Sequence, residues 1–150
     1  MKVVSFHSDH VDTVVKITEY FHKYSIYRQS PYNADGMRNS IIAQLANPNV
    51  RGWALVDDKG VCRGAMLVMV GSAYGCFYDV AMDTFYAVDK KAKGRGLMLL
   101  NECVRWAKAH PTVQRVVFNL SAGTPDQGRT ESLYKRLGME QVGSSWSLEV

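Results

Sequence analysis

The stretch 85–97 constrains the fold most strongly, because its pattern changes from strand to turn to helix over a few residues. Aromatic and β-branched residues end at Val88, a run of Lys, Arg and Gly follows, and apolar residues take a helical spacing from Leu97 onward. The first turn of a helix has free N–H groups and the positive end of the helix dipole, so a basic, glycine-containing turn there favours an anion. This pattern fits a diphosphate-binding loop, although an ordinary solvated basic loop before a helix would look the same.

The length and composition of the chain fit a single globular domain. It has 150 residues, of which 47% are hydrophobic and 21% charged, as in globular domains. Repeats, low-complexity tracts and linkers are not seen, so a single domain is expected over 1–150. The longest apolar run, 65–70, is much shorter than the roughly 20 residues of a membrane helix. The N-terminal residues do not resemble a signal peptide, so we expect a cytoplasmic protein that binds no membrane.

Cysteine and histidine usage argues against a metal centre. Cys62, Cys76 and Cys103 are odd in number and lack C-x-x-C spacing, so neither a disulfide framework nor a zinc site is expected. We interpret them as small buried residues. His7 and His10 have a metal-like spacing, but they stand at a strand-to-helix junction with no further ligand group nearby, which favours capping and surface roles. No metal is predicted.

Apolar spacing and turn residues predict the order β-α-α-β-β-β-α-β-α-β, a mixed α/β (α+β) layout. The expected strands are 3–6, 53–56, 61–70, 77–88, 113–120 and 141–150. Ser8 is expected to cap a first helix, whose buried positions would be Val11, Val14, Val15, Thr18 and Phe21. A second helix would bury Met37, Ile41, Ile42 and Leu45 and end at Asn47-Pro48, a third would run from Gly96 to just before Pro111, and a fourth would end at Gly138.

The strand over 77–88 carries two carboxylates. With side chains alternating along a strand, one face would present Asp79, Ala81, Asp83, Phe85 and Ala87, unless a bulge intervenes. Both aspartates would then point to the same side of the sheet.

Two common nucleotide-binding motifs are missing. The chain lacks G-x-x-x-x-G-K-[ST], and Gly94-x-Gly96 is followed by Leu99 where a dinucleotide-binding fold needs its third glycine. What the chain does contain is V-x-x-x-x-K-G-x-G over 88–96, then L-Y-x-x-L-G over 133–138 and Val142-Gly143. Over nearly its whole length it resembles the GNAT (Gcn5-related) N-acetyltransferase superfamily, and especially its small phage-encoded members. The resemblance implies a GNAT fold, in which a mostly antiparallel central sheet is flanked by helices.

The resemblance also implies a site for acetyl-CoA. The family's pyrophosphate-binding motif falls on Lys93, Gly94, Arg95, Gly96, Leu97 and Met98. Lys93 keeps the charge of the usual Gln or Arg position, whereas Met98 replaces a small residue and could narrow the loop. The main chain of Ala87 and Val88 would bind the pantetheine arm where two strands separate. Gln127 stands where many relatives carry a cofactor-binding Asn, and it could equally form a capping box with Thr124.

Two residues are candidates for catalysis. Tyr134 matches the family tyrosine that protonates the departing thiolate, and a pKa near 10 would keep it protonated at neutral pH. A tyrosine that only packs in the core is the alternative. Asp83 is the candidate general base, ahead of Asp79. The register leaves open that Met82 is the true match to the family's acidic position, in which case Asp83 would be a solvated or substrate-orienting residue.

The function that these residues imply is direct transfer of an acetyl group from acetyl-CoA to a primary amine of a small molecule or a protein. A non-catalytic GNAT-fold protein that binds CoA or a protein partner is the alternative. The tyrosines between Tyr20 and Tyr32, together with Arg28, would line the acceptor entrance or pack in the core. Binding of nucleic acid is not expected, since the net charge is only +4 and no aromatic residues interleave with the basic cluster. A homodimer through the C-terminal strand is an open expectation.

Overall fold

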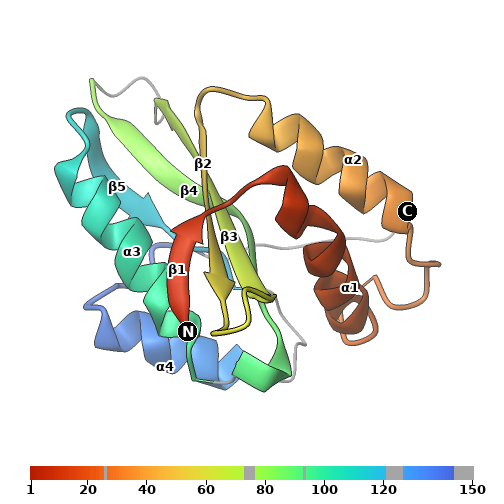
Figure 1. Ribbon diagram of the computed structural model, residues 1–150. Coiled ribbons are helices and arrows are strands. Elements are labelled where there is room, and N and C mark those ends of the chain that lie inside the picture. The colour runs from red at the N-terminus through yellow and green to blue at the C-terminus, as the bar shows by residue number, and fades with distance from the viewer. Residues whose placement is uncertain (26, 73–76, 93, 121–126, 144–150) are drawn as a thin grey trace.

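The computed structural model describes residues 1–25, 27–72, 77–92, 94–120 and 127–143. Five strands form one curved sheet in the order β1-β2-β3-β4-β5 (Figure 1). Their bounds are β1 Lys2–Ser5, β2 Val50–Val56, β3 Cys62–Ser72, β4 Asp79–Val88 and β5 Val113–Val117. The first four strands pair antiparallel, and β4 pairs parallel with β5. The predicted mixed α/β layout with a mostly antiparallel sheet is confirmed.

The helices lie on the two faces of this sheet (Figure 1). One face carries α1 (Val11–His22) and α2 (Ala34–Leu45), and the other carries α3 (Gly96–Ala109) and α4 (Gln127–Arg136). Two short 3-10 turns complete the description, η1 at Ser8–His10 and η2 at Lys90–Ala92. The turn η2 connects β4 with the loop that leads into α3.

Each face of the sheet has its own buried cluster. The cluster under α1 and α2 includes Phe6, Val14, Ile41, Ala65 and Leu67. The cluster under α3, which we call the α3-side core, includes Trp53, Met66, Val68, Leu99, Leu100 and Cys103. Burying a large apolar side chain fully stabilises a fold by roughly 1.5–3 kcal/mol, so these two clusters fix the helices on the sheet.

A bulge interrupts β4 at Thr84. Leu67 of β3 pairs with Phe85 and Val68 pairs with Asp83, so Thr84 between them has no partner on β3. The Thr84 hydroxyl lies 3.4 Å from the Leu67 carbonyl and also contacts a side chain of α2. A bulge of this kind shifts the alternation of side chains by one position along the strand.

The bulge corrects the expectation that five residues of this strand share a face. Asp79, Ala81 and Asp83 do lie on one face, toward α3. For Phe85 and Ala87 the prediction is wrong: they lie beyond the bulge and face α1 and α2, opposite residues of the other cluster. The two aspartates therefore point to the same side, as expected.

Several element ends differ from the sequence-based expectation. Ser8 does not cap α1, because it begins the turn η1, in which the His7 N–H donates to His10 Nδ1 at 3.0 Å. Ile42 was expected to be buried, yet it is 48% exposed on α2. The final strand was expected over 141–150; residues 141–143 are not in a strand, and the rest lies outside the described residues.

The described residues were searched for a membrane-spanning helix and for a metal-binding group. None of its helices is long and apolar enough to cross a membrane. The same residues contain no group of three or more His, Cys, Asp or Glu side chains that could hold a metal ion. Cys62 and Cys103 are buried free thiols, as expected, whereas Cys76 lies outside the described residues.

Candidate active site

The site begins where β4 and β5 separate. Their pairing runs from Asp79 opposite Val113 to Met82 opposite Val117, and the next residues of the two strands are not paired in the ladder. The gap is spanned by side-chain contacts instead. Asn119, two residues after β5, reaches across to Asp83, the first residue of β4 beyond the last pair.

The Asp83 carboxylate is buried at this gap, with only 9% of the residue exposed. Its Oδ1 accepts two hydrogen bonds from Asn119, one from the main-chain N and one from Nδ2, each at 2.7 Å. Burial raises the pKa of Asp83 to about 6, and the hydrogen bonds from Asn119 oppose part of that rise. A carboxylate with such a pKa is ionised at neutral pH and still basic enough to accept a proton.

Tyr134 reaches the same place from α4. Its hydroxyl donates to the main-chain carbonyl of Asn119 at 3.1 Å, and its ring lies 5.5 Å from that of Phe118. Burial, the Asp83 charge and Tyr86 together raise the pKa of Tyr134 above its ordinary value. The hydroxyl is therefore protonated throughout the neutral range. The two catalytic candidates, Tyr134 and Asp83, both contact one residue, Asn119.

The C-terminal end of α4 positions Tyr134. Gly138 has φ 73°, which a glycine adopts without strain. The N–H of Met139 donates to the Tyr134 carbonyl at 3.1 Å and the N–H of Gly138 donates to the Lys135 carbonyl at 3.0 Å, the pattern of a Schellman motif. The predicted helix stop at Gly138 is confirmed.

Tyr86 packs against the start of α3. The bulge brings Tyr86 to the α3 side of the sheet, where it packs against the α3-side core and burial raises its pKa to about 12. A Cβ added at Gly96 would overlap the Tyr86 hydroxyl. Gly96 is therefore required by close packing against Tyr86, a reason the sequence did not indicate.

The predicted phosphate loop lies between η2 and α3. Gly94 has φ 81°, and a Cβ at this position would meet nothing within 4 Å, so the backbone is open to the surroundings there. Arg95 is the N-cap of α3, and its N–H donates to the Ala92 carbonyl at 2.9 Å. The side chains of Lys91 and Arg95 are exposed. A helix N-terminus, an open glycine and exposed cations in one loop are suited to a phosphate group.

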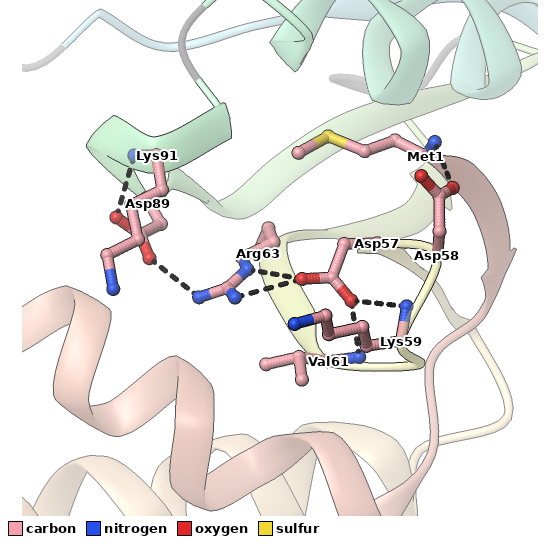
Figure 2. Close-up of polar contacts among 8 residues, drawn as sticks. All are labelled: Met1, Asp57, Asp58, Lys59, Val61, Arg63, Asp89 and Lys91. Carbon is pink, nitrogen blue, oxygen red and sulfur yellow. Dashed lines mark hydrogen bonds and ion pairs between the residues drawn. The ribbon is translucent and has the colours of Figure 1, made fainter.

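An ion network fixes the beginning of this loop (Figure 2). Arg63 on β3 donates to the Asp57 carboxylate at 2.9 Å, and its other terminal nitrogen lies 3.5 Å from Asp89 Oδ2. Asp89 also accepts from the Lys91 N–H at 3.0 Å, and its own N–H donates to the Arg63 carbonyl at 2.7 Å. The three charged side chains are between 15% and 23% exposed, so they are partly shielded from solvent. Hydrogen bonds from the Val61 N–H and then from Arg63 lower the pKa of Asp57.

The other predicted cofactor residues are distributed around this loop. Ala87 and Val88 pair with β3 on one edge of β4, and the other edge faces the gap beyond the last β5 pair. Met98 packs against the α3-side core. Leu97 lies in the first turn of α3, and Gln127 begins α4. Two predicted residues lie outside the described residues: Lys93 of the loop and Thr124, the expected capping partner of Gln127.

Two other residues of β4 were considered at the sequence level. Asp79 accepts from the Thr112 hydroxyl at 2.5 Å at the far end of β4. Met82 is 43% exposed and precedes Asp83 on the opposite face of the strand. Of the two aspartates considered for the base, Asp83 is the one that shares Asn119 with Tyr134.

A hollow of about 360 Å³ lies among α1, α2 and the segment that joins them. Its lining is made of His22, Tyr27, Tyr32, Asn33, Gly36, Met37 and Ser40. Neither Asp83 nor Tyr134 lines it. Tyr32 is held by its hydroxyl, which donates to the Val15 carbonyl at 2.8 Å, whereas Tyr27 is 66% exposed. Both tyrosines thus line the hollow, Tyr32 as a half-buried residue and Tyr27 as an exposed one.

Sequence reasoning missed three residues that organise the site, namely Asn119, Tyr86 and Arg63. Asn119 is a polar residue directly after an apolar strand, which is a usable signal, but its partner is 36 positions away. Tyr86 looks like any aromatic strand residue. Arg63 and Asp57 flank the predicted turn between two strands, so their pairing could have been expected from opposite charges across a hairpin.

The fold is that of GNAT acetyltransferases. A tetramutant of the BH1408 protein from Bacillus halodurans matches with a TM-score of 0.80 at 13% identity, over 100% of both chains. Glucosamine-6-phosphate N-acetyltransferase from Arabidopsis thaliana matches with a TM-score of 0.70 at 11% identity, over 99% of this chain and 97% of its own. An aminoglycoside acetyltransferase from an uncultured soil sample gives a TM-score of 0.67 at 14% identity, with 99% and 97% covered.

The sequence comparisons give no match. No family model matches this chain, and neither does any curated protein. At identities of 11% to 14% the structural matches establish the fold, whereas activity has to be argued from the residues of the site.

Proposed function

We propose that this protein transfers the acetyl group of acetyl-CoA directly to a primary amine. The observation that carries the proposal is the meeting of a buried carboxylate and a tyrosine hydroxyl at the gap between β4 and β5. Asp83 and Tyr134 are both hydrogen-bonded to Asn119 there. Acyl transfer to an amine needs one group that accepts a proton and one that donates a proton, and this pair provides both.

The loop from η2 into α3 supports the binding of the CoA diphosphate. Gly94 leaves the backbone open, the first turn of α3 offers N–H groups, and Lys91 and Arg95 supply positive charge. Met98, which could have narrowed the loop, packs against the α3-side core. When bound, acetyl-CoA would supply the acetyl group as a reactive thioester. Main-chain groups near Ala87 and Val88, on the edge of β4 that faces the gap, would hold the pantetheine arm.

The roles of the two side chains follow from their protonation states. In the overall transfer a bond forms between the amine nitrogen and the acetyl carbon, the carbon–sulfur bond breaks, the amine loses a proton and the thiolate gains one. Asp83, ionised above about pH 6, would accept the proton of the amine. Tyr134, whose raised pKa keeps it protonated, would give its proton to the thiolate. Asp83 would then release the amine proton to solvent, and Tyr134 would take up a proton from solvent, which restores both groups. Proximity of the reactants would supply much of the rate.

The proposal is tested by binding and turnover together. Calorimetric titration with acetyl-CoA measures the first, and release of free thiol in the presence of primary amines measures the second. The panel includes polyamines, peptide amines, amino-sugar phosphates and aminoglycosides, the last two because of the neighbours' names. We expect micromolar binding and thiol release with at least one amine.

Matched variants assign the roles. Tyr134→Phe is expected to slow the transfer by more than threefold, whereas Tyr78→Phe, at a tyrosine just before the Asp79 end of β4, leaves it unchanged. Asp83→Asn is expected to remove most activity, and Asp79→Asn, on the same strand and the same face, to retain it. A loss confined to Asp79→Asn would overturn the assignment of the base. Acetyl-CoA binding without turnover on any amine would favour the non-catalytic alternative.

The chemical class of the acceptor, the cellular location and the binding partners are further parts of the proposal. The acceptor is a primary amine of a small molecule or of a protein. We propose a cytoplasmic location, no binding of nucleic acid, and no resident metal. A homodimer remains a proposal that size-exclusion chromatography with light scattering would test.

A further inference from the structure

We infer that Asn119 is a positioning residue for the base: it holds one oxygen of the Asp83 carboxylate and leaves the other for the substrate amine. The inference rests on the proposed acetyl transfer and names a residue that the sequence motif does not contain. It assigns Asn119 a role in the pH dependence of the reaction and in the geometry of the acid–base pair.

The contacts define how the carboxylate is held. The main-chain N and Nδ2 of Asn119 both donate to Asp83 Oδ1 at 2.7 Å, and Nδ2 is also 3.1 Å from the Asp83 main-chain oxygen. Both side-chain-directed contacts from Asn119 thus go to Oδ1, and the Asp83 main-chain N–H also favours the carboxylate form. Two donors on one oxygen fix the plane of the carboxylate, and the second oxygen keeps its lone pairs for the proton of an incoming amine.

The same residue fixes the acid. The carbonyl of Asn119 accepts from the Tyr134 hydroxyl at 3.1 Å, so the separation of Tyr134 and Asp83 depends on one residue. Asn119 itself is exposed, whereas Asp83 is buried. Asn119 is therefore an exposed residue whose side chain reaches the buried carboxylate.

Asn119 also controls the charge of Asp83. Burial disfavours the carboxylate, and the hydrogen bonds from Asn119 favour it, so removing Nδ2 must raise the pKa of Asp83 further. The titratable groups that interact with Asp83 are Cys103 from α3 and Tyr134 from α4, and Tyr86 on β4 interacts with Tyr134. Their pKa values are all raised, so each is protonated at neutral pH. Asp83 is thus the group of this cluster that titrates between pH 5 and 8.

The experiment is a pH profile of kcat/KM for the wild type and Asn119→Ala. In the wild type the acidic limb is expected near pH 6. In Asn119→Ala we expect it to move up by about one pH unit, the effect of losing one hydrogen bond to a charged group. The rate then falls about eightfold at pH 5.5 and hardly at all at pH 8. Asn119→Asp, which puts a second carboxylate beside the first, should move the limb further.

Asn101→Ala, at an exposed asparagine of α3, is the matched control and should leave the profile unchanged. A purely structural role for Asn119 would lower the rate equally at all pH values and would overturn the inference. Folding of each variant is checked by circular dichroism, and Asn119→Ser replaces the alanine variant if the latter does not fold.

A second readout separates this inference from the proposed function. Carbon-detected NMR follows the Asp83 carboxyl without any substrate, and Asp83→Asn identifies its signal. If the midpoint near pH 6 moves up in Asn119→Ala while no amine is acetylated, the control of Asp83 by Asn119 holds and the proposed function fails. If amines are acetylated but the midpoint does not move, the function holds and this inference fails.

Discussion

Gly96 provides a sharp test of how the phosphate loop and the core fit together. In Gly96→Ala the new Cβ overlaps the Tyr86 hydroxyl, while the next atoms, Val88 Cγ2 and Tyr86 Cζ, are 3.3 and 3.4 Å away. Overpacking of this kind costs about 1–3 kcal/mol, and the better helix propensity of Ala returns up to about 1 kcal/mol. We therefore expect a net loss of about 1–2 kcal/mol, or a fall in Tm of about 2–8 °C for a domain of this size.

Removing the hydroxyl should reverse the effect. In the double variant Gly96→Ala/Tyr86→Phe the closest remaining contacts are tight but tolerable, so the stability should return to that of Tyr86→Phe or slightly above it. Urea denaturation of the four proteins in the cycle measures the coupling. Gly128→Ala is the control, because its Cβ meets nothing within 4 Å. If Gly96→Ala is as stable as the wild type, or if Tyr86→Phe does not rescue it, the packing argument is wrong.

Three further predictions concern charge. Arg63→Ala should weaken acetyl-CoA binding by calorimetry without lowering kcat, since it frees the start of the loop from its two carboxylate partners; an equal loss in kcat would contradict a role limited to the loop. Asp83→Asn should be more stable than the wild type above pH 6. Burial raises the folded-state pKa of Asp83 from 3.8 to about 6, so ionisation costs the wild type up to about 3 kcal/mol as the pH rises through that range. Thermal melts of both proteins at pH 4 and pH 7 would refute this if the difference in Tm did not increase with pH. Lys91→Glu/Arg95→Glu should weaken acetyl-CoA binding more than tenfold at low salt, whereas Lys108→Glu at the other end of α3 should not; equal effects would contradict a local phosphate site.

The sequence predicted those features that depend on neighbouring residues. The strand, the basic turn and the helix around Gly94 follow from local composition, and the stop of α4 at Gly138 follows from the need for a positive φ. The resemblance to a family then brought Asp83 and Tyr134 together, which spacing alone could not have done. What escaped prediction depends on contacts between distant segments, such as the reach of Asn119 across the gap and the packing of Tyr86 against the start of α3.

The bulge at Thr84 explains why one strand can serve both the core and the site. In a regular strand Asp83 and Tyr86, three positions apart, would point to opposite faces, and Tyr86 would lie under α1 and α2. The extra residue shifts the alternation, so Asp83 and Tyr86 both face α3, while Phe85 fills the other face of the sheet. Because the bulge lies beyond the last residue of β4 that pairs with β5, it costs no hydrogen bonds in that ladder. The separation of the strands and the change in side-chain alternation thus occur at neighbouring positions of β4, and together they place Asp83 and Tyr86 on the α3 side of the sheet.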